Sequence, residues 1–124
     1  MSLCMFVMND TTYSNFAKWI MRINQTDLPP ENVIAFNFGL FENSNGFYTM
    51  YLIGSRVFDA EDDDWACSND YAPTEKYFDL SELLSSTVDL VKQFIESPEF
   101  VVSFLANAFA ITVGFDDGDL KRVK

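Results

Sequence analysis

Histidine is absent from the 124-residue chain, and cysteine occurs only at Cys4 and Cys67. Without histidine the chain lacks the commonest general base, the Ser-His and Cys-His nucleophile systems, and most zinc and copper sites. Two widely separated cysteines supply neither a metal-binding spacing nor a disulfide framework. We therefore expect free thiols in a reducing compartment, with Cys67 packed as a small residue. With no recognisable catalytic site, the chain is expected not to be an enzyme and to need no cofactor.

Glycine is also scarce, and long apolar runs are missing. The five glycines fit neither a Walker loop nor a dinucleotide-binding fingerprint. The longest uncharged run, residues 100–115, is shorter than the roughly 18 residues of a membrane span. The first residues lack the basic region of a signal peptide. We therefore expect a cytoplasmic, soluble protein with no membrane partner.

Basic side chains are few, because eight lysines and arginines stand against 19 acidic residues, for a net charge of -11. Such a balance argues against binding to nucleic acid backbones. The excess is local: residues 1–58 carry four acids and three bases, whereas residues 59–124 carry 15 acids and five bases. Residues 59–75 alone hold seven acids and no base. A concentrated charge says more about recognition than a diffuse one, which mainly supports solubility.

The N-terminal part of the chain predicts a helix. Residues 3–8 could form a short strand, and the capping residues 9–12 then lead into an apolar face at helical spacing. Pro29 and Pro30 end this helix. The apolar face consists of Tyr13, Phe16, Trp19, Ile20 and Ile23.

After the two prolines, the spacing of apolar residues changes from a helical period to alternation, which is typical of a strand. Between residues 34 and 40 the apolar side chains share one strand face, and Asn37 and Gly39 take the other. Asn45-Gly46 is a hairpin signal, and residues 47–53 form the returning strand. Residues 59–73 have no sustained period and predict a long loop.

The next segment predicts two helices. Asp79 and Glu82 resemble a capping box at the start of an apolar stripe that reaches Ile95. Ser97-Pro98 starts another helix, and the apolar residues 100–109 predict a short, deeply buried one.

A second hairpin ends the chain, because residues 111–115 alternate and Asp117-Gly118 could turn the strand back into residues 120–123. Residues 1–124 are therefore expected to form one α+β domain. We expect an antiparallel sheet with helices segregated to one face, in the order (β)αββ-loop-ααβ(β).

The acidic loop is the candidate functional site. Crowded like charges cost stability unless they meet a cationic partner, and aromatic anchors inside a charged rim are common in protein interfaces. The acids would speed the encounter while Trp65 supplied buried area, although Trp65 could equally fold inward as core. We expect a basic protein as the partner. The predicted contact residues are Asp59, Glu61, Asp62, Asp63, Asp64, Trp65, Asp70, Tyr71, Asp116, Asp117 and Asp119.

Two alternative functions stay open. Asp59, Glu61 and Asp63 alternate, and Asp70 takes the twelfth position of a calcium loop, although Asp64 stands where such a loop needs glycine. The chain could therefore be a calcium-binding domain that uses this loop. It could also be a structural or housekeeping domain whose acidity only aids solubility. An exposed sheet edge could support a homodimer, but nothing in the pattern selects one.

Two stretches resemble small bacterial proteins of polymorphic-toxin immunity loci, namely residues 52–67 (LIGSRVFDAEDDDWAC) and 113–120 (VGFDDGDL). They cover about a fifth of the chain. The resemblance implies a cytoplasmic, acidic immunity protein that binds and blocks a cognate toxin, often a basic nuclease. On that interpretation the protein is a non-enzymatic inhibitor with an acidic inhibitory surface.

Overall fold

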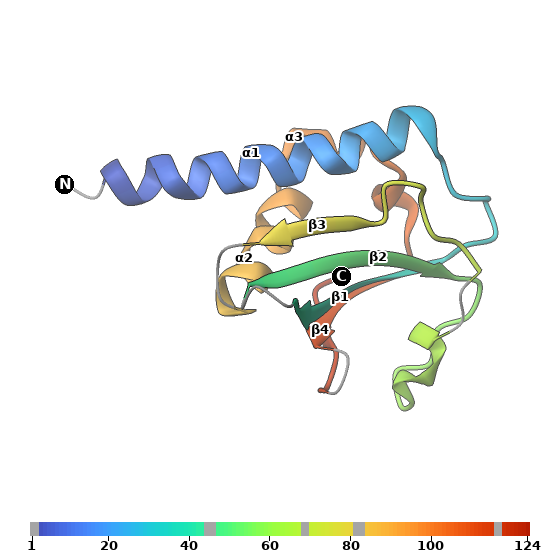
Figure 1. The fold of residues 1–124 in the computed structure, drawn as a ribbon. Coiled ribbons are helices and arrows are strands. Elements are labelled where there is room, and N and C mark those ends of the chain that lie inside the picture. Colours follow the sequence, from blue (N-terminus) through green and yellow to red (C-terminus); the bar gives the residue numbers. More distant parts are fainter. Residues whose placement is uncertain (1–2, 44–46, 68–69, 81–83, 116–117) are drawn as a thin grey trace.

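The chain begins with a long helix and continues through strands and shorter helices, as Figure 1 shows. The computed structural model describes residues 3–43, 47–67, 70–80, 84–115 and 118–124. Within these ranges the elements are α1 (Leu3–Thr26), β1 (Ala35–Glu42), β2 (Tyr48–Ser55), the 3-10 helix η1 (Asp63–Cys67), β3 (Tyr77–Leu80), α2 (Leu84–Ile95), α3 (Pro98–Val101), the 3-10 helix η2 (Phe104–Asn107), β4 (Ala110–Phe115) and β5 (Lys121–Arg122).

The five strands form one sheet in the order β3-β2-β1-β4-β5. β1 and β2 make the expected antiparallel hairpin, with Ala35 opposite Ser55 and Glu42 opposite Tyr48. β3 and β5 are also antiparallel to their neighbours. β1 and β4 run parallel, because the chain passes through α2, α3 and η2 before it returns to the sheet. The expected α+β class is confirmed, and the sheet departs from the expected antiparallel arrangement in this one pair.

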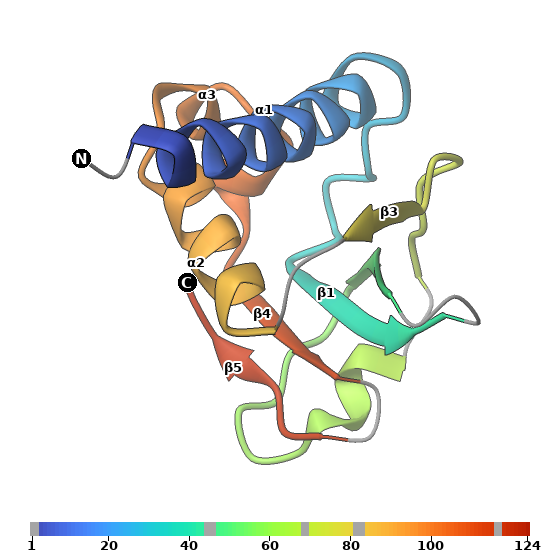
Figure 2. The same cartoon turned by 60° about the vertical axis from the view of Figure 1, so that its left-hand side comes forward.

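The main core lies between the sheet and the helices, and we call this side of the sheet its inner face. α1 and α2 cover the same face in Figure 2. Phe36, Phe38 and Leu40 of β1 are buried there, against the apolar face predicted for α1. The indole of Trp19 donates a hydrogen bond to the carbonyl oxygen of Glu75 at 2.7 Å, which ties α1 to the segment before β3. The two long α-helices therefore gather on one face, as the sequence predicted.

The beginning of α1 differs from the sequence prediction. Residues 3–8, expected as a strand, are the first turns of α1, which continues through the supposed capping residues 9–12. No proline or glycine interrupts residues 3–26, so nothing ends the helix there. Figure 1 shows this end of α1 extending past the sheet. No helix in the described ranges is long and apolar enough to cross a membrane.

Two further predictions in the C-terminal half are corrected. Asp79 lies in β3 and accepts a hydrogen bond from the Thr49 hydroxyl at 2.9 Å, so it is a strand residue rather than a helix cap. Glu82, the other half of the supposed capping box, lies outside the described residues. The expected buried helix at 100–109 is divided between α3 and η2, and Val101 at their junction is 73% exposed. Apolar composition alone does not show which side chains face solvent.

The outer face of the sheet, opposite α1 and α2, contains a close approach between neighbouring strands. Gly39 of β1 is paired with Tyr51 of β2. A Cβ atom at position 39 would lie 2.1 Å from Cζ of the Tyr51 ring, whereas carbon atoms in contact are about 3.5–4.0 Å apart. The absence of a side chain at Gly39 therefore allows the Tyr51 ring to lie across β1.

Replacing Gly39 with alanine is expected to lower the free energy of unfolding by about 2 kcal/mol, because the added methyl group displaces a packed ring. Urea denaturation measures this change. Gly118→Ala is the matched control, since the nearest described atom to a Cβ there, Phe115 Cβ, lies 3.7 Å away, and it should change the free energy by less than about 0.5 kcal/mol. Equal losses in the two variants would contradict the close approach.

Candidate functional site

Trp65 fixes the acidic loop to the outer face of the sheet. Its side chain is only 5% exposed and packs with Ala35 and Ala110, the first residues of the two central strands. The Phe58 ring lies 5.1 Å from it in a near-perpendicular arrangement. Such burial makes Trp65 part of the core, so the expectation of an exposed anchor at this position is corrected. The acids on either side of it are therefore carried on a loop whose centre is packed against the sheet.

Tyr71 holds the other end of the loop, and it too is buried. Its side chain is 8% exposed, and its backbone forms an isolated antiparallel bridge with Gly54 of β2. The phenol donates a hydrogen bond to the carbonyl oxygen of Asp27 at 2.6 Å. Burial raises the pKa of Tyr71 above its ordinary value, with a smaller contribution from the nearby negative charge of Asp27. The predicted role of Tyr71 as a surface contact is therefore corrected.

Five carboxylates of the loop face solvent. Asp59, Glu61, Asp62, Asp63 and Asp64 are all exposed. Asp59 accepts a hydrogen bond from the backbone of Glu61 at 2.9 Å, and Asp62 accepts one from Asp64 at 3.0 Å. These turns order the backbone and keep the neighbouring acids outside. The prediction of an exposed acidic surface is confirmed for these residues.

The loop also reaches the turn between β4 and β5. An oxygen of the Asp63 carboxylate accepts a hydrogen bond from the backbone N–H of Leu120 at 3.3 Å. Asp119, the preceding residue, is exposed. The fold therefore brings Asp119 to the acidic loop, as the sequence analysis suggested. Asp116 and Asp117 lie outside the described residues.

Asp70 has a structural contact within the loop. Its carboxylate accepts hydrogen bonds from the Arg56 backbone at 2.8 Å and from the Arg56 guanidinium at 3.3 Å. The backbone hydrogen bond is the main reason that the pKa of Asp70 lies below its ordinary value, and the charge of Arg56 adds to the effect. Asp70 closes the loop on β2, so its negative charge is already paired within the chain.

A pocket of about 330 Å³ lies between η1 and the outer face of the sheet. Asn37 and Tyr51 line it from the strands, while Asp63, Asp64 and Cys67 line it from η1. Neither Asn37 nor Tyr51 was among the contact residues predicted from the sequence. The alternation in β1 had placed Asn37 on the side opposite the core, and a polar residue within an apolar strand was the available signal.

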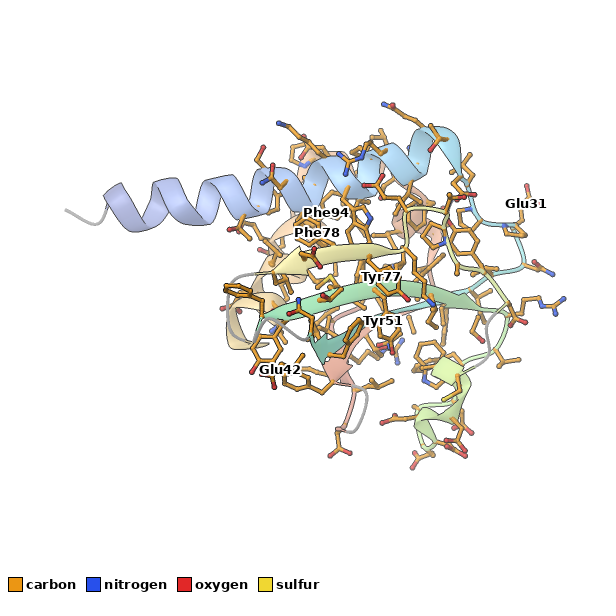
Figure 3. The ribbon with its side chains drawn as sticks, viewed as in Figure 1. Glu31, Glu42, Tyr51, Tyr77, Phe78 and Phe94 are labelled. Carbon is orange, nitrogen blue, oxygen red and sulfur yellow. The ribbon has the colours of Figure 1, made fainter. Side chains whose placement is uncertain are left out.

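An aromatic cluster lies beside this pocket. The Phe41 ring is 6.2 Å from Tyr51 and 6.1 Å from Tyr77, and the three residues come from β1, β2 and β3. Figure 3 shows Tyr51 and Tyr77 together on the sheet, away from Phe78 and Phe94, which pack against α1. Tyr77 is 55% exposed, so this cluster presents exposed aromatic area on the sheet.

The alternative of a calcium loop receives no geometric support. Within the described residues, no group of three or more acidic or cysteine side chains is placed so that it could hold a metal ion. Asp59 and Asp62 instead use their carboxylates in backbone turns.

Cys67, expected as a packed residue, is exposed at the end of η1. The short 3-10 helix directs Trp65 inward and leaves Cys67 on the outside.

A scan against protein-family models finds no match, and searches of curated proteins and of solved structures likewise find no significant match.

Replacing Asp70 with asparagine is expected to destabilise the protein at neutral pH by weakening its contacts with Arg56. The contribution of the carboxylate is complete above the unfolded-state pKa, near 3.8, and is lost as the pH falls through the lowered pKa of the folded state. Urea midpoints of the wild type and Asp70→Asn should therefore differ at pH 7 and converge in acid. Asp64→Asn, which removes no contact with Arg56, serves as the control, and a difference that persists at pH 2 would contradict the assignment.

Proposed function

We propose that the protein is a non-enzymatic inhibitor of a basic protein partner, of the immunity type, and that the outer face with its acidic loop is the binding surface. One observation carries the proposal: five exposed carboxylates are displayed on a loop whose centre and ends are anchored in the fold. An ordered display of like charge has little use inside the chain, because the charges repel one another.

The chemistry of this surface favours a cationic macromolecule. Glu61 and Asp64 have exposed carboxylates that accept no hydrogen bond from the described residues. Complementary charge would steer a basic partner to the loop and raise the rate of association. The exposed ring of Tyr77 and the neighbouring aromatic cluster would supply the apolar contact that the sequence analysis had attributed to Trp65.

Inhibition would follow from occupancy of the partner's basic surface. A nuclease binds its anionic substrate through lysine and arginine side chains, so an acidic protein seated on them excludes the substrate. The described part of the chain needs no catalytic group for this action. The proposal places the encounter in the cytoplasm, where an exposed thiol such as that of Cys67 stays reduced.

Reversing the charge of the two uncommitted acids, Glu61→Lys with Asp64→Lys, is expected to weaken partner binding at least tenfold, because attraction becomes repulsion while the turns made by Asp59 and Asp62 are kept. The immobilised protein would capture its partner from an extract of the source organism. Elution with increasing salt would then rank the affinities of wild type and variant.

Glu31→Lys with Glu96→Lys is the matched control, since it changes the net charge equally at two exposed positions outside the loop. Glu31 lies far from the loop in Figure 3. The control should retain its partner to nearly the same salt concentration as the wild type. An equal loss in both double variants would show that overall charge, rather than this surface, governs binding.

A further inference from the structure

An exposed apolar patch lies at the end of the sheet where β2 ends and β1 and β4 begin. We call it the Phe109 patch, and it consists of Ile34, Val57 and Phe109, which are 36%, 55% and 61% exposed. The N–H of Phe109 donates to the carbonyl oxygen of Ile34 at 2.7 Å, and the N–H of Ile34 donates to that of Ser55 at 2.9 Å. The N–H of Val57 donates to the Ser55 hydroxyl at 3.1 Å. The three residues therefore lie together, and a grouped apolar patch is typical of an interaction site.

A stack of aromatic rings joins this patch to the acidic loop. The Phe109 ring lies 5.8 Å from the Phe58 ring, which lies 5.1 Å from the buried Trp65. Phe58 directly precedes Asp59, and Trp65 directly follows Asp64. The contact between Phe58 and Trp65 thus closes the base of the loop that carries the five exposed carboxylates. The acidic loop therefore starts and finishes beside the Phe109 patch.

We propose that the Phe109 patch receives an apolar side chain of the basic partner, from a segment whose neighbouring lysine and arginine side chains pair with the acidic loop. This inference rests on the proposed function and specifies what the partner presents to the surface. The occupant is a protein segment in which a leucine-like side chain is flanked by cations.

Arg122 determines which part of that segment the patch accepts. Its guanidinium carbon lies 4.9 Å from the centre of the Phe58 ring and 5.3 Å from that of Phe109. The same group donates hydrogen bonds to the backbone oxygens of Phe109 at 3.1 Å and Lys124 at 2.7 Å. Because these rings already hold a cation of the chain itself, a second cation at the same place would be repelled. The patch therefore suits an uncharged side chain, and the cations of the partner belong at the loop.

The charge beside the patch distinguishes a basic protein from other occupants. A second copy of this chain would bring its own acidic loop close to the first one, since loop and patch adjoin, and an anionic lipid surface would be repelled in the same way. Three partly exposed side chains also fall well short of the roughly 800 Å² that each partner buries in a stable interface. The patch is therefore one part of a contact that includes the loop.

The test uses the full chain, labelled with ¹⁵N, and the peptide acetyl-Lys-Arg-Leu-Arg-Lys-amide as the probe. Titration is expected to saturate and to shift the backbone signals of Val57, Phe109 and Glu61 together. The peptide with serine in place of the central leucine has the same charge and should bind at least about fivefold more weakly, because it lacks the apolar contact. Equal affinities of the two peptides, or shifts confined to the acidic loop, would overturn the proposal.

Two matched valine variants locate the apolar contact. Val57→Ser should weaken binding of the leucine peptide about threefold, while Val101→Ser, at a more exposed valine of α3, should change it less than about 1.5-fold. In Figure 1, α3 lies beside α1 and away from η1. Phe109→Ser should weaken binding at least about fivefold, and Val57→Ser provides the answer if that variant does not fold. Equal effects of the two valine variants would contradict the assignment.

Charge reversal separates a failure of this proposal from a failure of the proposed function. Glu61→Lys with Asp64→Lys is expected to weaken binding of the leucine peptide at least about tenfold. If the two peptides bind equally and both are lost on charge reversal, the patch is refuted and the acidic surface remains. If Phe109→Ser weakens binding and charge reversal does not, the acidic loop is refuted as the cation contact, and the proposed function fails with it.

Sedimentation and vesicle flotation test the two other occupants. We expect the wild type to be a monomer and not to float with phosphatidylcholine vesicles. A dimer that Phe109→Ser dissociates would assign the patch to a second copy of the chain, and flotation that the same variant abolishes would assign it to a lipid surface. Either result would overturn the proposal.

Discussion

The contact between Trp65 and the two small residues Ala35 and Ala110 is the constraint on which the candidate site depends. Two alanines at the start of neighbouring strands leave room for an indole on the face opposite α1 and α2. Because Trp65 belongs to η1, its packing against these alanines places η1 over the outer face. As a consequence, the acids before Trp65 stand over the sheet, and a pocket forms between η1 and the strands.

The free energy of burying Trp65, compared with that of charge repulsion, explains how so acidic a segment stays folded. Burying one large aromatic side chain contributes about 3 kcal/mol, whereas repulsion between exposed like charges costs about 0.5 kcal/mol for each close pair. Trp65 therefore offsets several such repulsions. Asp70 on Arg56 and Asp63 on Leu120 fix the loop at two more points. The remaining carboxylates can then face solvent without loosening the segment.

The spacing of apolar residues predicted much of this fold, because it depends only on which residues share a face within one helix or strand. The apolar face of α1 and the alternation in β1 and β2 identify the inner core, since burial follows from spacing within each element. The start of α1 at Leu3 was missed because capping residues 9–12 can also continue a helix. The exposed acids were also predictable, since a run of carboxylates has no place in a core.

Long-range pairing was not predictable, and the pocket depends on it. Alternation in a strand does not show which strand will lie beside it or in which direction, and β1 and β4 are far apart in the chain. Their parallel pairing sets Asn37, which lines the pocket, opposite Thr112, whose hydroxyl donates a hydrogen bond to the Asn37 amide oxygen.

The same register sets Gly39 opposite Gly114. A Cβ atom at Gly39 would meet the Tyr51 ring, and one at Gly114 would lie 2.8 Å from the Asp119 carbonyl oxygen. The missing side chain at Gly39 therefore lets the Tyr51 ring approach the outer face, and the missing side chain at Gly114 does the same for Asp119 and Leu120. The unpredicted parallel pair and the unpredicted pocket are therefore one structural feature.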